Sequence, residues 1–334
     1  MTLRMNLGEN GYDVLLEPGC LLRAGELVNL DRRVLVVTDG GVPKEYAETV
    51  AAACREATVV TVPEGEGSKS FPVLEGLLKR MLDAGFTRGD CAVAVGGGVV
   101  GDLTGLAAAL YMRGIDFYNI PTTLLSQADS SIGGKTGIDF AGVKNVVGAF
   151  HQPKKVLIDP DTLSTLPRRQ IAAGHAEIVK AGLIADAELF SLYETGKADA
   201  DPVAALSRAL AVKKAVVEAD EKESGLRRIL NFGHTVGHGI ESVTGLLHGE
   251  CVALGMIPMC APSVRERLIP VLRRLGLPTE VRADPEKVYA ALLHDKKAAG
   301  GKITAVIVTE PGKCEQIPLA PNELREKIET VVKA

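Results

Sequence analysis

Short apolar runs alternate with helical patterns along the first half of the chain. The runs lie at 34–37, 58–62, 91–95, 115–120 and 156–158, and most of them are apolar at nearly every position. Strands that are apolar on both faces are typical of a parallel sheet covered by helices on each side. The pattern therefore predicts an α/β domain built on a parallel sheet.

The second half of the chain has a different pattern. Strand signals nearly vanish after Pro167, and we expect successive helices at 170–184, 186–195, 202–219, 226–242, 250–261 and 285–295. Turn chemistry at 163–169 directly precedes the first of these helices, which makes Pro167 the expected hinge. The sequence thus predicts an α/β domain over 1–166 and a mainly α-helical domain over 167–334.

Length and composition support two domains and argue against some classes of binding partner. A chain of 334 residues exceeds the ~250 residues at which single cores stop growing. The net charge of −4 argues against a nucleic acid or an anionic membrane as partner. No apolar run reaches the ~18 residues that span a bilayer, and no signal-peptide core is present. Because the six cysteines form no C-x-x-C pair, we expect reduced thiols and a cytoplasmic protein.

Histidines crowd into one window of the second half. Three of the six lie between His234 and His248. His234 and His238 are four residues apart and share a helix face, and His248 can return from the next turn or helix. A catalytic zinc takes three protein ligands and leaves one position open, so the window indicates a metal site. The alternative is one packed and one solvated histidine.

A carboxylate and several cations accompany these histidines. Glu177 is the candidate third ligand, and Lys180 lies on the same helix face. Lys213, Glu223 and Arg227 precede the histidine window, and 295–297 (Asp-Lys-Lys) follows it. Such charges usually belong to solvated faces, but around a metal they suit a polyanionic substrate.

A glycine-rich turn follows the run at 91–95. The segment 96–102 satisfies G-x-G-x-x-G and leads into a helical pattern that continues to Leu110. Glycines let the backbone approach a pyrophosphate, and the N-terminus of the helix attracts its charge; close packing of strand and helix is the alternative. Because several strands precede the turn, further cofactor contacts must come from elsewhere. Asp39 and the segment 63–69, both at carboxyl ends of strands, are candidates, although each could be a polar turn.

A lysine-containing loop at 129–137 resembles the end of a phosphate-binding loop of the Walker type. Asp129 occupies the position of its first glycine, so we do not expect ATP hydrolysis there. Lys135, together with Asp129 and the later pair Lys144 and Asn145, can instead grip a smaller phosphate or carboxylate. A solvated loop is the alternative.

Taken together, these motifs resemble the 3-dehydroquinate synthase family of the sugar phosphate cyclase superfamily. The resemblance runs from Asp39 to Lys297. It includes Gly65-Glu66 with Lys69, the glycine-rich turn, Glu177 with Lys180, the histidine window and the segments 112–114, 121–127 and 133–137.

The resemblance implies a fold, cofactors and a substrate. It implies a Rossmann-like N-terminal domain that binds NAD, a helical C-terminal domain that holds zinc or cobalt, an active site in the cleft between them, and a homodimer. The substrate would be the small sugar-acid phosphate 3-deoxy-D-arabino-heptulosonate 7-phosphate. It would be oxidised by NAD, lose phosphate, be reduced again, open its ring and close by an aldol step to 3-dehydroquinate, in the shikimate pathway of aromatic amino acid biosynthesis.

The resemblance also implies roles for individual residues. Zinc would bind Glu177, His234 and His248, which moves His238 from the metal to the substrate. Residues around the substrate would be Asp129, Lys135, Asn145, Lys180, Lys213, Glu223, Arg227, Asn231, His238, Lys296 or Lys297, and Arg113 from a second subunit. Residues around NAD would be Asp39, Glu66, Lys69, Gly97, Gly98, Asp102, Thr122, Thr123, Lys144 and Thr165.

Three alternatives remain beside this interpretation: another sugar phosphate cyclase, a metal-dependent NAD polyol dehydrogenase, and a regulatory protein that binds NAD or zinc. The chain also departs from the family pattern. The connection between His238 and His248 is short, Gly239 replaces a common alanine, and His151 stands where an aromatic residue is usual.

Overall fold

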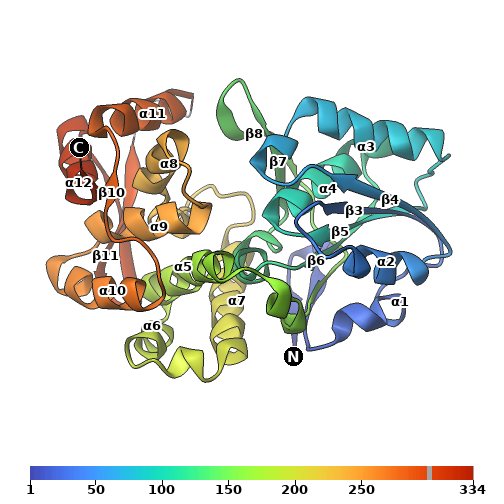
Figure 1. The fold of residues 1–334 in the computed structure, drawn as a ribbon, viewed down its shortest axis with the longest axis horizontal. Helices are drawn as coiled ribbons and strands as arrows, with labels where there is room; N and C mark the ends of the chain where they lie inside the picture. Colours follow the sequence, from blue (N-terminus) through green and yellow to red (C-terminus); the bar gives the residue numbers. More distant parts are fainter. Residues whose placement is uncertain (299–302, 334) are drawn as a thin grey trace. The chain divides into compact units, whose positions relative to one another are not determined.

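Two compact units make up the chain, Met1–Leu166 and Pro167–Ala334 (Figure 1). The structure is a computed structural model that describes residues 1–298 and 303–333, apart from the side chains of 294–298. Among the described residues, no helix combines the length and the apolar character needed to cross a membrane.

The first unit is built on a seven-stranded sheet with the order β1-β2-β9-β6-β5-β3-β4. Only the β1–β2 pair is antiparallel, and every other pair in this sheet is parallel, which confirms the predicted α/β class. The strands are β1 (Thr2–Met5), β2 (Tyr12–Leu16), β3 (Arg33–Asp39), β4 (Glu56–Val62), β5 (Cys91–Gly96), β6 (Asp116–Pro121) and β9 (Lys155–Ile158).

Helices cover both faces of this sheet. Leu35 and Val37 of β3 pack into the core with α3 (Phe71–Asp83) and α4 (Gly98–Leu110). Val34 and Val36 face the opposite core, with α1 (Ala24–Leu27) and α2 (Lys44–Ala52). All four side chains are fully buried, each contributing about 1.5–3 kcal/mol of apolar burial. Alternate residues thus serve opposite cores, which explains the continuous apolar run.

The strand order places a switch point between β3 and β5. From β3 the chain first adds β4 on one side, and β5 and β6 then extend the sheet on the other. The carboxyl ends of β3 and β5, at Asp39 and Gly96, are therefore neighbours, and open α/β sheets bind ligands at such a point.

Smaller elements complete the first unit. The antiparallel hairpin of β7 (Lys135–Phe140) and β8 (Val143–Phe150) packs on α4. The short helical segments are η1 (Gly8–Asn10), η2 (Cys20–Arg23), η3 (Glu66–Ser68), η4 (Tyr111–Arg113), the π-helix η5 (Ser126–Ser130) and η6 (Pro160–Thr165).

The second unit is mainly helical, as predicted. Its helices are α5 (Arg168–Ala185), α6 (Ala187–Glu194), α7 (Pro202–Ala219), α8 (His234–Val243), α9 (His248–Met256), α10 (Pro262–Arg274), α11 (Pro285–Ala298) and α12 (Pro321–Val331), with the 3-10 segments η7 (Lys197–Asp199), η8 (Leu226–Asn231) and η9 (Ile257–Met259).

Strands also occur in the second unit, so the expectation that they nearly vanish after Pro167 was wrong. An antiparallel hairpin joins β11 (Thr304–Glu310) to β12 (Lys313–Pro318). The short strands β10 (Val281–Arg282) and β13 (Val332–Lys333) pair in parallel. The β-branched run at 304–308 carried the signal for the hairpin.

Two predicted helices have different bounds in the structure. The stretch 226–242 is broken, because Gly233 adopts a left-handed φ of 80° between η8 and α8. A Cβ there would meet Val252 O of α9 at 2.8 Å, so the close approach of α9 requires glycine. The stretch 250–261 begins earlier, at His248, and its α-helical part ends at Met256.

Candidate functional site

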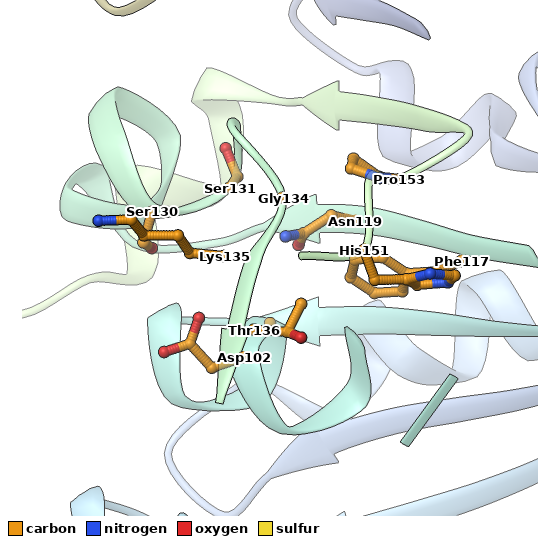
Figure 2. Close-up of a pocket in the computed structure, with 11 residues that line it drawn as sticks. Asp102, Phe117, Asn119, Ser130, Ser131, Gly134, Lys135, Thr136, His151 and Pro153 are labelled. Atoms are coloured by element: carbon orange, nitrogen blue, oxygen red, sulfur yellow. The ribbon is translucent and has the colours of Figure 1, made fainter. Parts of the chain in front are cut away.

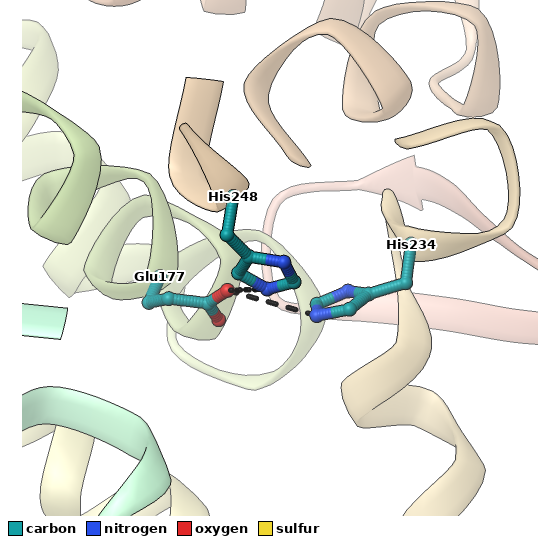
Figure 3. Close-up of side chains that lie close together, drawn as sticks. All are labelled: Glu177, His234 and His248. Carbon is teal, nitrogen blue, oxygen red and sulfur yellow. Dashed lines mark ion pairs between the residues drawn. The ribbon is translucent and has the colours of Figure 1, made fainter. Parts of the chain in front are cut away.

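A buried carboxylate faces two imidazoles in the second unit (Figure 3). Glu177 comes from α5, His234 is the first residue of α8, and His248 is the first residue of α9. Glu177 Oε1 lies 3.7 Å from His234 Nε2 and 3.6 Å from His248 Nε2. One potential ligand atom from each residue lies within 4.8 Å of the others, so the structure brings together the three predicted metal ligands.

Both imidazoles are oriented by their other nitrogen. His234 Nδ1 lies 3.1 Å from Phe232 O, and His248 Nδ1 lies 3.2 Å from Glu241 Oε2. A carbonyl or carboxylate oxygen only accepts, so Nδ1 is the donor in each pair. The Nε2 atoms, which face Glu177, are thereby left to bind a cation.

The surroundings of Glu177 fit a divalent metal. Its side chain is 1% exposed and forms an ion pair with that of Lys180, which is 2% exposed. Neither Glu177 oxygen accepts a hydrogen bond from the described residues. This buried carboxylate and the two Nε2 atoms match the two-histidine, one-carboxylate ligand set of catalytic zinc sites.

Electrostatics keep His234 and Glu177, but not His248, in the protonation states that bind a cation. Burial, followed by the nearby Lys180 charge, lowers the pKa of His234 to about 3, so its ring is neutral. Burial alone would raise the pKa of Glu177, but Lys180 and the two histidines hold it well below its ordinary value. Burial would likewise lower the pKa of His248, but Glu177 and Glu241 raise it to about 10. A cation that binds here replaces the proton of His248.

The helices that carry the set are fixed against each other. A Cβ on Gly249 would overlap Ala173 O, so α9 can approach α5 this closely only with glycine. Arg169 of α5 donates from Nε and Nη2 to the two oxygens of Glu250, each at 2.7 Å. Glu250 Oε2 also accepts from Leu247 N at 2.8 Å, at the start of α9. These contacts hold His248 next to the helix that carries Glu177.

Of the predicted substrate residues, His238 lies directly beside this set. His238 stands one turn after His234 on α8, with ring centroids 5.3 Å apart. Asn231 Nδ2 donates to Glu223 Oε1 at 2.8 Å. The side chains of Lys296 and Lys297 lie outside the described residues.

Two predicted cations of the second unit are buried. Lys213 on α7 is 7% exposed, and Arg227 on η8 is 2% exposed. Arg227 Nη1 donates to Glu221 O at 2.5 Å. Two positive charges are thus buried in one helical unit, an arrangement that suits an anionic ligand.

The turn between α7 and η8 is organised by Asp220. Its carboxylate accepts from the backbone N–H groups of Ser224, Gly225 and Arg227 at 2.8, 2.7 and 3.0 Å. The hydrogen bond from Arg227 N and those that accompany it hold the pKa of Asp220 well below its ordinary value. Glu223 in this turn has a left-handed φ of 59°. Asp220 therefore fixes the backbone that presents Glu223 and Arg227.

A second polar cluster surrounds Lys69 in the first unit. Lys69 Nζ donates to Asp102 Oδ2 at 2.8 Å and bonds Asn145 Oδ1. Glu66 Oε1 lies 3.6 Å from Lys69 Nζ and 3.8 Å from Lys144 Nζ. The structure thus brings together four predicted cofactor residues and Asn145, which was predicted to contact substrate.

Replacing Lys69 with methionine should destabilise the first unit by about 2–3 kcal/mol, because Lys69 is 4% exposed and Asp102 would lose its buried partner. Burial would lower the pKa of Lys69, but Asp102 and Glu66 raise it above its ordinary value. This contribution is complete below the unfolded pKa of about 10.4 and is lost as pH rises through the folded value. Urea unfolding should show the same difference from wild type at pH 6 and at pH 9.

The control for this substitution is Lys79→Met. Lys79 forms an exposed pair with Asp83, with side chains 70% and 55% exposed. Its loss should change the free energy of unfolding by less than about 0.5 kcal/mol. Equal effects of Lys69→Met and Lys79→Met would contradict a buried anchor at Lys69.

The glycine-rich turn lies at the start of α4, at the switch point of the sheet. A Cβ on Gly97 would lie 3.1 Å from Thr123 Cγ2, and one on Gly98 would lie 3.0 Å from Ser130 Oγ. Thr122 N donates to Gly96 O at 2.9 Å. The backbone of the glycine-rich turn therefore passes close to Thr122 and Thr123, and side chains at Gly97 and Gly98 would obstruct this approach.

The two remaining predicted cofactor residues have other contacts. Asp39 Oδ1 accepts from Gly41 N at 2.8 Å, and burial raises the pKa of Asp39. Thr165 Oγ1 lies 3.1 Å from Tyr46 Oη of α2.

A small pocket of about 220 Å³ lies beside the lysine loop (Figure 2). Lys135, an exposed residue at the start of β7, lines it with Asp102, and Asp129 lies just upstream in η5. The hydroxyls of Ser130 and Ser131 are buried and have no hydrogen-bond partner among the described residues. These hydroxyls, beside the Lys135 ammonium, suit ordered water or a small anionic group.

His151 also lines this pocket, at the position where the family pattern has an aromatic residue. Its ring stacks on Phe117, with centroids 6.5 Å apart, and its Nε2 lies 2.9 Å from Ile115 O. Burial lowers the pKa of His151, so the ring is neutral near pH 7. His151 therefore fills an aromatic position without adding charge.

Arg113 lies at the amino ends of the strands, opposite the glycine-rich turn. It follows α4, whose 13 residues run about 20 Å from the glycine-rich turn toward the amino ends of the strands. Met112 and Arg113 have left-handed φ values of 49° and 69°, which cost about 1–3 kcal/mol each and are typical of functional segments. The structure does not bring Arg113 to the Lys69 cluster.

Comparisons with known proteins agree with this arrangement. A model described as 3-dehydroquinate synthase N-terminal matches residues 59–173, and one described as 3-dehydroquinate synthase C-terminal matches residues 174–298. A 3-dehydroquinate synthase of Caulobacter vibrioides is 46% identical to the chain over 92% of each protein. The chain belongs to the 3-dehydroquinate synthase family. The resemblance predicted from the motifs is thereby confirmed.

Solved structures extend the similarity to the fold. A 2-epi-5-epi-valiolone synthase of Streptomyces hygroscopicus subsp. jinggangensis, solved with NAD+ and Zn2+ bound, is 30% identical, with a TM-score of 0.87 over 96% of each chain. A 2-deoxy-scyllo-inosose synthase, complexed with carbaglucose-6-phosphate, NAD+ and Co2+, shares the fold at 24% identity, with a TM-score of 0.88 over 98% of this chain and 99% of the other.

Four residues that support the site residues were not predicted from the sequence: Arg169, Asp220, Glu241 and Glu250. Glu241 follows His238 by three residues, a spacing that places both on one helix face. Asp220 opens a turn after a helix, where aspartate is common. Arg169 and Glu250 gave no signal, because their pairing joins distant segments.

Proposed function

We propose that this chain converts 3-deoxy-D-arabino-heptulosonate 7-phosphate to 3-dehydroquinate and phosphate, as a lyase of the shikimate pathway. The observation that carries the proposal is the buried Glu177 facing His234 and His248, in a unit that also buries the cations Lys213 and Arg227. Membership of the 3-dehydroquinate synthase family, at 46% identity to a curated relative, supports it.

The proposed cofactors are NAD and one divalent ion, zinc or cobalt. Glu177, His234 and His248 hold the ion. Gly97 and Gly98 offer their backbone to the dinucleotide, helped by Asp39, Glu66, Lys69, Asp102, Thr122, Thr123, Lys144 and Thr165. When bound, the dinucleotide supplies a reversible hydride acceptor and the ion supplies a Lewis acid for a substrate hydroxyl.

The remaining site residues bind and neutralise the substrate. Its carboxylate and phosphate are matched by Lys135, Asn145, Lys180, Lys213, Arg227, Asn231, His238 and one of Lys296 and Lys297, while Glu223 orients Asn231. Asp129 accepts a hydrogen bond from a substrate hydroxyl. Cations already positioned around the phosphate favour its departure, because they need not reorganise as negative charge develops on it. The chain mainly positions groups and balances charge.

The buried cations favour this substrate over those of related cyclases. The alternative cyclase substrates are sugar phosphates that lack a carboxylate. Lys213 and Arg227 are 7% and 2% exposed, and a substrate that carries both a carboxylate and a phosphate complements two buried positive charges better than a phosphate alone.

A homodimer is part of the proposal. Arg113 lies in a strained turn near the amino ends of the strands, at the end of the sheet opposite the glycine-rich turn. Its guanidinium would therefore act on the substrate of a second subunit, where it meets the phosphate.

One assay tests the function. Purified protein is mixed with catalytic NAD, zinc and the heptulosonate phosphate, and phosphate release and NADH absorbance are followed together. We expect stoichiometric phosphate and no lasting NADH, because the hydride returns to the product. Lasting NADH would indicate a polyol dehydrogenase. Phosphate release from hexose or heptulose phosphates alone would indicate another cyclase, and no turnover would favour a regulatory protein.

A further inference from the structure

The two imidazoles that face Glu177 are held by chemically different groups. His234 Nδ1 contacts a backbone carbonyl, Phe232 O, within its own segment. His248 Nδ1 contacts a carboxylate, Glu241 Oε2, from the neighbouring helix α8. The Glu241 side chain is 10% exposed, so water screens this pair only weakly.

A carboxylate at this position does more than a carbonyl can. By accepting from Nδ1–H it fixes the tautomer and the ring plane, and its charge makes Nε2 a stronger donor to a cation. The close contact of Gly249 with Ala173 holds His248 against α5, and the contact of Glu241 with His248 Nδ1 links His248 to α8 as well. Glu250, the other buried carboxylate at the start of α9, is committed to Arg169 and Leu247 N.

We propose that Glu241 is a positioning residue of the metal centre, which sets the strength and direction of His248 as a ligand. The proposal rests on the metal set proposed above. Glu241 touches the ligand and not the ion, and it makes the two histidines unequal, with His248 the stronger donor.

A second arrangement of the same side chains defines the competing outcome. His238, Glu241 and His248 also offer ligand atoms within 4.8 Å of one another. An ion bound to that set would make Glu241 a ligand, and the protein would bind two ions per chain if the Glu177 set were filled as well.

The test measures metal binding to the full-length protein without substrate. Metal is removed from wild type, from the variants Glu241→Gln, Glu241→Ala, His238→Asn and Glu177→Ala, and from the neighbouring control Ser242→Ala. Each is titrated with zinc against a chromophoric chelator and with cobalt, whose visible spectrum reports ligand geometry. We expect zinc affinity to fall about 10- to 100-fold in Glu241→Ala. Glu241→Gln should lose less, because its amide oxygen still accepts from Nδ1–H, and Ser242→Ala should match wild type.

The outcomes separate this inference from the function it rests on. If Glu177→Ala loses zinc while Glu241→Ala keeps wild-type affinity and an unchanged cobalt spectrum, the positioning role is overturned and the metal set stands. If Glu177→Ala keeps wild-type affinity, the metal set itself is wrong. A second equivalent of zinc that disappears in both Glu241→Gln and His238→Asn would also overturn the proposal, since Glu241 would then be a ligand.

Discussion

Glu177→Ala is expected to abolish high-affinity zinc binding and to lower phosphate release at least about 1,000-fold. A Lewis acid contributes several kcal/mol to a reaction barrier, and each 1.4 kcal/mol is tenfold in rate. Removal of Glu177 takes away the only carboxylate between His234 and His248 among the described residues. The first unit does not contain this residue, so NAD affinity should be unchanged.

Three measurements check this expectation: metal content by elemental analysis, NAD affinity by calorimetry, and phosphate release. Chelator treatment of the wild type should reproduce the loss of activity, and added zinc should restore it. Glu188→Ala is the control, because that carboxylate is 81% exposed on α6. Full activity and normal metal content in Glu177→Ala would show that the ligand set is wrong.

Gly249→Ala should destabilise the second unit by about 3 kcal/mol, the upper end of the range for overpacking. The added methyl group would overlap Ala173 O, a backbone atom that cannot rotate away. The helix α9 must then move from α5, which also carries His248 away from Glu177. Zinc affinity should therefore fall together with the urea midpoint.

Gly245→Ala is the control, since Gly245 lies in the connection just before α9 and a Cβ there meets nothing within 4 Å. Its free energy of unfolding should change by less than about 0.5 kcal/mol. If Gly249→Ala were as stable as Gly245→Ala, the close contact between α5 and α9 would not be a constraint.

Local patterns predicted the elements whose packing follows from their own residues. The apolar run at 34–37 indicated a strand between two cores, and the stretch 202–219 has the bounds of α7. The break at Gly233 could not be predicted in this way. It depends on Val252 and Met256 of a later helix, which a periodicity of 3.6 residues does not register.

The site shows the same division. The i,i+4 spacing of His234 and His238 indicated a pair of ligands, whereas the structure turns the two rings toward different neighbours. The residues themselves made Glu177 the candidate carboxylate, and the resemblance to the family then moved His238 from the metal to the substrate and kept His248 as a ligand. Glu241 was missed because a glutamate three residues after a histidine is common on any amphipathic helix. Only the contact with His248 distinguishes it.

The origin of the three proposed ligands on separate helices has a consequence for biosynthesis. Glu177 leaves the ribosome long before His234 and His248, and the three meet only when α5, α8 and α9 have docked. A nascent chain that ends before α9 has two of the three ligands and no closed site. Closure of the proposed metal site therefore requires synthesis through α9, and zinc capture would follow the docking of the three helices.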